Sequence, residues 1–310
     1  MSDSNSKLTP ETFKFRHRLE FTLFNSLKRW GKGASKKTRR RGTILLDGLL
    51  YHGLRICRSI VAINLELAFP KFSTVERKQI ARANYRWFAR FCMDVLHMDA
   101  WKGRTSEIAK CHNLEILDQA LSEKKGVLLI SGHFGNWEMI PPALAELGYP
   151  VTMYVGRQTN PLTNKLQNTA RANFGVETID KGKRATLQMG RALAANKIIA
   201  MLIDQNDNKS DLFVNFFEKL ASSSKGTAAF HLLRKSPVVL VTCPYVGDYL
   251  EISFQRITFD LSGEQEKDTL AITQKITSAF ENVIRKYPEQ YFWMHRRWRA
   301  RPQEDPEDIY

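Results

Sequence analysis

Residues 126–138 read Gly-Val-Leu-Leu-Ile-Ser-Gly-His-Phe-Gly-Asn-Trp-Glu, an apolar run followed by a turn with two glycines. The run Gly126–Ser131 has the length of a buried strand. His133 follows it directly in the turn, and Glu138 lies in the first turn of the helix expected next. Functional sites of open α/β sheets lie where strands end. The stretch therefore predicts a buried parallel strand with His133 at its carboxyl end.

The same alternation continues to the C-terminus. It predicts an α/β fold with a mostly parallel central sheet wrapped by helices, preceded by a helical, basic N-terminal region. The expected strands are Gly126–Ser131, Val151–Val155, Val176–Ile179, Lys197–Asp204, Pro237–Cys243 and Tyr249–Ile257. The expected helices are Trp137–Leu147, Leu162–Phe174, Arg184–Ala195, Ser224–Arg234 and Asp268–Arg285.

Two helices are expected before the sheet. Apolar residues recur with a helical period over Thr43–Ile63, which predicts one helix there. A second helix is expected over Thr74–His97, with Ser73 or Thr74 as its N-cap residue.

The chain is basic, and much of its charge lies at the N-terminus. Its 310 residues include 47 Lys and Arg against 32 Asp and Glu, a net charge of +15. Residues 1–41 hold twelve of these cations and three acids, with Phe, Leu and Trp between them. This mixture is typical of a segment that binds an anionic membrane surface. It is equally typical of a solvated basic tail or a nucleic-acid-binding arm. We expect a membrane-surface segment over 1–41 and a single α/β domain over 42–310.

Several classes of protein are disfavoured by what the sequence lacks. No apolar run reaches the roughly 18 residues that a spanning helix needs. The polar stretch Met1–Pro10 lacks the apolar core of a secretion signal. The four cysteines are scattered without metal-ligand spacing, so neither a disulfide framework nor a zinc site is expected. A cytoplasmic protein, free or peripheral to a membrane, is the default expectation.

His133 and Glu138 are candidates for a catalytic pair. A carboxylate near a histidine can orient the ring and keep it basic enough to take a proton. The structural alternative is a hydrogen-bonded histidine at a capped helix start. The G-x-S-x-G elbow, the P-loop, the H-E-x-x-H motif and the dinucleotide fingerprint are all missing. No nucleophile stands beside the pair, which favours a base acting on the substrate's own hydroxyl group.

Five segments also carry a family resemblance. They are His133–Glu138; Arg58–Pro70 with Ser73–Arg77; Tyr154–Arg157 with Asn160, Pro161 and Arg171–Gly175; Ile203–Gln205 with Val214–Phe217; and Tyr291–Arg299 with Arg301 and Pro302. In order and spacing they resemble the bacterial lipid A biosynthesis acyltransferases, the late lauroyl and myristoyl transferases with an HxxxxE motif. The resemblance covers about residues 55–302.

The resemblance implies a fold like that of glycerolipid acyltransferases. It also implies transfer of a fatty acyl chain from acyl carrier protein to a hydroxyl group of a lipid A precursor, with no cofactor or metal. His133 is then the general base and Glu138 its partner. Arg157 and Arg171 are expected to bind substrate phosphate, and Asp204 to orient Arg171 or another basic group. The hydrogen-bond donors that stabilise the oxyanion are expected to be backbone amides near the helix start after His133, or the side chains of Arg157 or Arg171.

The implied partners are the acidic carrier protein, the lipid A precursor and an anionic membrane, without nucleic acid. The implied place is the cytoplasmic face of the bacterial inner membrane, in a peripheral or monotopic mode. One departure is that family members commonly begin with an apolar anchoring stretch, whereas this chain begins with a basic one.

Two alternative functions stay open. One is acyl transfer to another phospholipid or glycolipid, with a carrier-protein or coenzyme A donor. The other is a basic nucleic-acid-binding protein, although no such module is recognisable.

Overall fold

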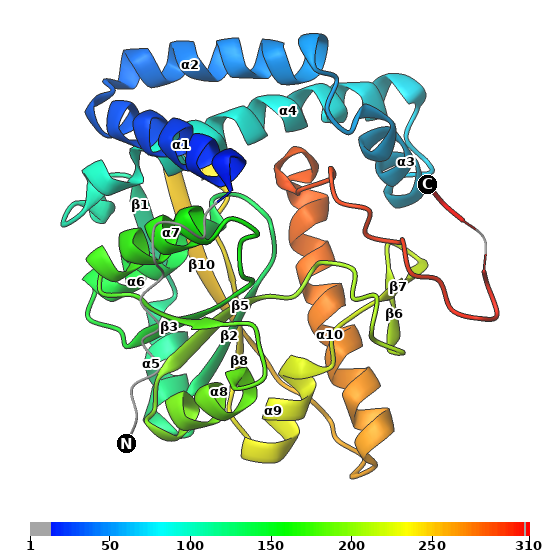
Figure 1. The fold of residues 1–310 in the computed structure, drawn as a ribbon. Helices are drawn as coiled ribbons and strands as arrows, with labels where there is room; N and C mark the ends of the chain where they lie inside the picture. The colour runs from blue at the N-terminus through cyan, green and yellow to red at the C-terminus, as the bar shows by residue number, and fades with distance from the viewer. Residues whose placement is uncertain (1–13, 307) are drawn as a thin grey trace.

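The fold is α/β and is built on one central sheet (Figure 1). The structure is a computed structural model and describes residues 14–306 and 308–310. The strands are β1 Ala109–His112, β2 Val127–Ser131, β3 Val151–Val155, β4 Glu177–Asp180, β5 Ile198–Leu202, β6 Phe213–Phe216, β7 Lys219–Ser222, β8 Val238–Thr242, β9 Tyr245–Val246 and β10 Tyr249–Ile257.

The central sheet is mostly parallel, which confirms the predicted fold class. Its order is β1-β10-β8-β2-β5-β3-β4, with β9 paired to β10. The run from β8 through β2, β5 and β3 to β4 is parallel throughout. Strand β10 is antiparallel to β8. Strands β6 and β7 form a separate hairpin.

Helices cover both faces and one end of the sheet. Figure 1 shows α1, α2 and α4 lying across one end, with α8 and α9 toward the other. The α-helices are α1 Phe15–Gly33, α2 Lys36–Gly48, α3 Arg58–Ala68, α4 Thr74–His97, α5 Leu114–Ser122, α6 Ile140–Glu146, α7 Pro161–Asn173, α8 Ala185–Ala194, α9 Gly226–Arg234 and α10 Gln265–Lys286. Shorter turns are η2 Leu49–Gly53, η3 Met98–Trp101, η4 Thr105–Glu107, η5 Trp137–Met139 and η6 Pro288–Gln290.

Most of the predicted elements are confirmed. Each of the six expected strands and the five helices after residue 125 has a counterpart in the structure. Helix α4 begins at a capping box, in which the Ser73 side chain accepts from the Glu76 amide and Glu76 accepts from the Ser73 amide. Helix α1 confirms the predicted helical, basic N-terminal region. The sequence did not predict β1, α5 or the β6–β7 hairpin.

The single helix expected over Thr43–Ile63 is wrong. Helix α2 ends at Gly48, a π-helical turn follows in η2, and α3 begins only at Arg58. Between them the backbone of Arg55 and Cys57 is left-handed, a conformation that no α-helix contains. The Tyr85 hydroxyl of α4 donates to the Ile56 carbonyl and so fixes this break through a tertiary contact.

The core forms on both faces of the sheet. Along β2, Leu128 and Ile130 belong to one buried cluster, whereas Val127 and Leu129 belong to the other. All four side chains are inaccessible to solvent. A parallel strand buried on both faces reads as a continuous apolar run. This explains why the sequence predicts β2 so clearly.

Helix α1 is held tightly against α4 and near α7. A Cβ atom at Gly31 would lie 2.6 Å from the Leu96 carbonyl oxygen, so only glycine permits this approach. The Asn160 amide donates to the His17 carbonyl at 2.9 Å. None of the helices in residues 14–306 combines the length and apolarity needed to cross a membrane. Residues 1–13 of the predicted membrane-surface segment lie outside the described residues, and the domain division after residue 41 stays a prediction.

Candidate active site

His133 and Asp204 meet at the carboxyl edge of the sheet. Strands β2 and β5 are parallel neighbours, with Ser131 opposite Leu202. His133 and Asp204 each lie two residues beyond this pair, so the register brings them together. The Nδ1 atom of His133 is 2.9 Å from Asp204 Oδ1, and the His133 backbone N–H donates to Asp204 Oδ2 at 3.0 Å. One carboxylate therefore holds both the ring and the backbone of His133.

Glu138 is not the hydrogen-bond partner of His133, contrary to the prediction. Its carboxylate accepts from the Arg171 guanidinium of α7, at 3.1 Å and 3.3 Å from Nη2. Asp204 was expected to orient Arg171 or another basic group, and the basic group that it holds is His133. Of the two carboxylates, Glu138 therefore holds Arg171 and Asp204 holds His133. Asp204 reaches His133 through strand register, a relation that sequence separation does not show.

The electrostatics suit a proton acceptor at His133. Burial lowers the pKa of His133, but the charge and hydrogen bond of Asp204, with a smaller effect of Glu138, outweigh it and leave the pKa raised. Burial raises the pKa of Asp204, but the contacts with His133 outweigh it and leave that pKa lowered. An ionised Asp204 accepts from Nδ1–H, so Nε2 of the neutral ring carries the free lone pair.

The turn that carries His133 requires glycine at two positions. A Cβ atom at Gly132 would lie 2.2 Å from the Phe280 ring. Gly135 has a φ of +58°, and a Cβ atom there would lie 2.0 Å from the Cys243 carbonyl oxygen. Both glycines permit close packing of the backbone, and Gly135 also permits the left-handed conformation.

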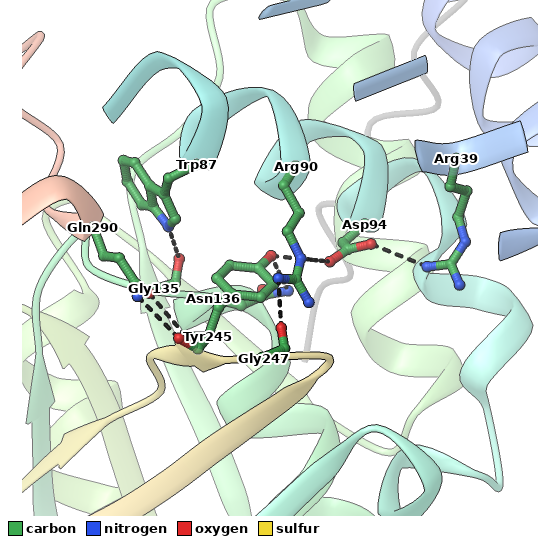
Figure 2. A network of polar contacts seen from close by, with 9 residues as sticks. All are labelled: Arg39, Trp87, Arg90, Asp94, Gly135, Asn136, Tyr245, Gly247 and Gln290. Atoms are coloured by element: carbon green, nitrogen blue, oxygen red, sulfur yellow. Dashed lines mark hydrogen bonds and ion pairs between the residues drawn. The ribbon is translucent and has the colours of Figure 1, made fainter. Parts of the chain in front are cut away.

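A polar network fixes the same turn from behind (Figure 2). The Gly135 N–H donates to the Gln290 carbonyl at 2.9 Å, and the Trp87 indole donates to the Gly135 carbonyl at 3.3 Å. The Asn136 side-chain amide donates to the Tyr245 hydroxyl at 3.1 Å. The turn is thus tied to α4, to the segment after β8 and to the segment after α10.

This network continues outward to α2. The Tyr245 hydroxyl donates to the buried Asp94 carboxylate at 3.0 Å, and Asp94 accepts from Arg39 at 3.0 Å (Figure 2). Burial raises the pKa of Asp94, although Arg90 and Arg39 act in the opposite direction. The residues come from five separate segments of the chain, so no local sequence motif could have predicted the network.

A cavity of about 690 Å³ lies in front of His133. Its polar wall includes Glu138, Arg171 and Gln205. Side chains from α1, α4, η3, α6 and the strands make the apolar wall, among them Phe24, Phe91, Val95, Met98, Ile140 and Met153. Such a volume falls within the range of small-molecule sites, about 300–1,000 Å³. No three His, Cys, Asp or Glu side chains among the described residues cluster as a metal site would require.

Arg157 stands apart from the other predicted site residues. Its side chain is 74% exposed and its Nε atom is 3.3 Å from Asp180 of β4. It follows β3 at the same edge of the sheet, yet it is not among the residues that line the cavity. The structure therefore brings together His133, Glu138, Arg171 and Asp204, and leaves Arg157 on the outer surface. A substrate role for Arg157 stays a prediction.

Two residues of the C-terminal segment, His295 and Arg297, also support the site, although neither is among the predicted site residues. The Asn206 N–H donates to His295 Nε2 at 3.0 Å. Burial lowers the pKa of His295 to about 4, so this ring is neutral at physiological pH. The buried Arg297 guanidinium donates to the Ser222 carbonyl and the Ser223 hydroxyl. These contacts position the loop after Asp204; their only signal in the sequence was the family motif itself.

Comparison with known proteins agrees with the resemblance. Residues 49–300 match the family described as bacterial lipid A biosynthesis acyltransferase. The lipid A biosynthesis palmitoleoyltransferase of Escherichia coli K12 is 28% identical over 252 residues, 79% of each chain. The lipid A biosynthesis lauroyltransferase of the same strain is 25% identical over 80% of each chain. The phosphatidylinositol mannoside acyltransferase of Mycolicibacterium smegmatis is 24% identical, over 71% of this chain and 73% of the relative.

Proposed function

Because this chain belongs to the bacterial lipid A biosynthesis acyltransferase family and is an acyltransferase, we propose that it moves a fatty acyl chain from acyl carrier protein to a hydroxyl group of a lipid A precursor. The observation that carries the proposal is the His133–Asp204 pair, which faces a cavity with an extensive apolar wall. A buried carboxylate behind a histidine is an arrangement that activates hydroxyl groups.

The proposed reaction begins at Nε2 of His133. The acceptor hydroxyl gives its proton to Nε2 while its oxygen attacks the thioester carbonyl carbon. Asp204 keeps the proton of Nδ1 in place and stabilises the imidazolium that forms. The tetrahedral intermediate then collapses, the carbon–sulfur bond breaks, and the departing sulfur takes the proton from Nε2. The donor thioester is already activated, so holding the two reactants together supplies much of the remaining rate enhancement.

The acyl chain is assigned to the apolar wall of the cavity. Phe91 stacks on Trp137 with ring centroids 3.9 Å apart, and Trp137 lies edge-on to the His133 ring. From Phe91 the wall continues along α4 through Val95 to Met98. The thioester carbon then lies near His133 while the hydrocarbon follows α4. Helix α1 closes this side through Phe24 and Lys28, and Lys28 forms an ion pair with Asp99 at 3.2 Å.

A second acceptor class is favoured by one comparison. The mycobacterial relative is named for phosphatidylinositol mannoside, a glycolipid other than lipid A. The catalytic step is the same for any lipid hydroxyl, so the pair at His133 does not distinguish the acceptors.

The experiment that tests the proposal presents the purified protein with defined donors and acceptors. Acyl carrier protein or coenzyme A carries the chain, and a lipid A precursor, a phospholipid or a phosphatidylinositol mannoside accepts it. Mass spectrometry identifies the product. We expect a lipid A precursor heavier by one acyl group, formed faster from the carrier protein. Acylation of another lipid alone would replace the acceptor, and faster transfer from coenzyme A would replace the donor.

Arg171 is proposed to bind a phosphate group of the lipid. Its side chain lines the cavity and retains donors beyond those used by Glu138. Arg171→Ala should raise the KM for the lipid about tenfold or more, since a hydrogen bond to a charged group contributes about 1.5–3 kcal/mol. Turnover should fall less. Arg157→Ala is the matched control, because that arginine lies outside the cavity. A raised KM in the Arg157 variant alone would place the phosphate on the outer surface instead.

Helix α1 is proposed to bind the cytoplasmic surface of the inner membrane. Phe15, Leu19, Leu23, Leu27 and Trp30 recur three or four residues apart and are all exposed. Residues at this spacing share one face of a helix. Helices α1 and α2 also carry exposed cations, including Arg29, Lys32, Lys37, Arg40 and Arg41. An apolar helical face among cations is typical of interfacial binding without spanning. The opposite face of α1 covers the cavity, so a bound membrane would lie next to the acyl site.

Leu19→Glu combined with Leu23→Glu tests the membrane proposal. Both leucines are 60% exposed, so the fold tolerates the change. Partition to anionic vesicles should weaken at least tenfold, since burying each leucine contributes roughly 1.5–3 kcal/mol. The matched control is Leu233→Glu on α9, at the far end of the molecule in Figure 1 and 79% exposed. Flotation of the double variant at the wild-type level would contradict this proposal.

A further inference from the structure

The proposed reaction needs hydrogen-bond donors for a negative oxygen. When the hydroxyl attacks the thioester, charge develops on the former carbonyl oxygen, and one well-placed donor is typically worth about 10²–10³ in rate. The sequence suggested two kinds of donor: the backbone amides that follow His133, and the side chains of Arg157 and Arg171. In the structure, the amides from His133 to Asn136 donate to oxygens of the protein, and both arginines are paired with carboxylates.

The backbone amides from His133 to Asn136 are engaged within the protein. Each of the first four donates to an oxygen of the protein, which leaves none of them aimed at the cavity. The pairs are His133 to Asp204 Oδ2 at 3.0 Å, Phe134 to the Gly132 carbonyl at 2.8 Å, Gly135 to the Gln290 carbonyl at 2.9 Å and Asn136 to the Cys243 carbonyl at 2.7 Å.

The two arginines are less suitable than they appeared from the sequence. Arg157 is on the outer surface, paired with Asp180. Arg171 lines the cavity, but both oxygens of Glu138 hold its Nη2 atom and Asn168 accepts from its Nη1 atom at 3.2 Å. Among the described residues, neither arginine side chain forms a hydrogen bond with His133.

Gln205 is the polar side chain that meets the reacting atom of the base. Its Nε2 atom is 3.4 Å from Nε2 of His133, and the side chain lines the cavity. Asp204 occupies Nδ1 of His133, so Nε2 carries a lone pair and faces the amide NH₂ group rather than the amide oxygen. At 3.4 Å this contact is weak. A weak contact is easily replaced when a substrate hydroxyl approaches Nε2.

The backbone on both sides of Gln205 is anchored. Asp204 before it is bound to His133. Asn206 after it donates its backbone N–H to His295 Nε2, and its side-chain Oδ1 accepts from the Ala300 N–H at 2.9 Å. A donor on a fixed loop needs little free energy to reorient when charge develops, and oxyanion stabilisation requires such a preorganised donor.

We propose that the side-chain amide of Gln205 donates a hydrogen bond to the oxyanion of the tetrahedral intermediate. The acceptor hydroxyl displaces the amide from Nε2 of His133 and takes its place there. The carbon under attack is then one bond from that hydroxyl oxygen, and the carbonyl oxygen is one bond further. The displaced NH₂ group therefore remains beside the oxygen that becomes negative. This inference rests on the proposed acyl transfer and assigns Gln205 a direct role in it.

Gln205→Met tests the assignment, because methionine has a similar length and no N–H donor. We expect the single-turnover rate with carrier-protein thioester and lipid A precursor to fall about 10²–10³-fold. The KM for the lipid and the thermal unfolding temperature should stay near wild type, because the side chain is exposed. The pH at which the rate is half-maximal should not move, since Asp204 still holds His133. A shift of that pH would assign Gln205 to tuning the base and overturn the proposal.

A second donor substrate makes the test specific. In a dithioester the carbonyl oxygen is replaced by sulfur, which accepts hydrogen bonds weakly. Gln205→Met should therefore cost much less with a dithioester than with the thioester; an equal cost would overturn the proposal. Ser131→Ala is the comparison, because the buried Ser131 hydroxyl also lines the cavity. A large loss there with none at Gln205 would move the donor to Ser131. Wild-type product in the same assay separates failure of this inference from failure of the proposed function.

Discussion

His133→Ala should lower the single-turnover rate of acyl transfer by about 10²–10⁴-fold, the usual cost of losing a general base. Without the imidazole, the enzyme loses the base that Asp204 orients at this edge of the cavity. Substrate binding should change much less, because the glycines and the network behind the turn do not depend on the ring. Rapid mixing of excess enzyme with acyl carrier protein donor and lipid acceptor measures the chemical step.

Two controls keep the His133 result interpretable. The thermal unfolding temperature shows whether the variant folds, since removal of the ring takes the Nδ1 hydrogen bond from the buried Asp204 carboxylate. His133→Gln retains a donor toward Asp204 but has no basic nitrogen, and it should be equally slow. Near-normal turnover by a folded His133→Ala variant would contradict the mechanism.

Asp204→Asn should be almost as damaging, with a loss approaching the roughly 10⁴-fold seen when the corresponding Asp of a Ser-His-Asp triad is changed to Asn. An amide in place of the carboxylate can donate to Nδ1, which moves the ring proton to Nε2 and leaves no lone pair facing the cavity. It also removes the charge that stabilises the imidazolium. The single-turnover assay measures the effect.

Glu138→Gln provides the matched comparison for Asp204→Asn. Both changes remove one negative charge near His133, but only Asp204 is hydrogen-bonded to the ring. We expect a distinctly smaller loss for Glu138→Gln. The double variant His133→Ala with Asp204→Asn should be no slower than His133→Ala alone, because both residues serve one proton transfer. A greater loss for Glu138→Gln would restore the pairing predicted from the sequence.

The sequence was most informative where chemistry is local. The apolar runs of β2, β5 and β8 predict buried parallel strands, and the glycines around His133 predict a turn with little room. These features place His133 at a carboxyl edge before any coordinates are known. The break between α2 and α3 was missed because a tertiary contact from Tyr85 holds it, while the apolar period runs on through it.

The parts of the site that the sequence did not predict depend on which strands are neighbours. Strands β2 and β5 are adjacent although β3 and β4 lie between them in the chain. Their register pairs His133 with Asp204, whereas proximity in sequence suggested Glu138. The same register places Gln205 beside the base. Arg157 shows the opposite error, since it follows a strand at the correct edge yet turns to Asp180 on the surface.

The pH dependence of the single-turnover rate, measured for the wild type and for Asp204→Asn, tests most directly whether His133 oriented by Asp204 is the base. His133 acts only when neutral, so the wild-type rate should rise with pH through a midpoint above 6.5, because Asp204 and Glu138 outweigh burial and raise its pKa. In Asp204→Asn the charge is lost and burial dominates, so the midpoint of the residual rate should move to lower pH. A midpoint that stays in place, or a wild-type rate that does not vary with pH, would contradict the assignment of His133 and Asp204.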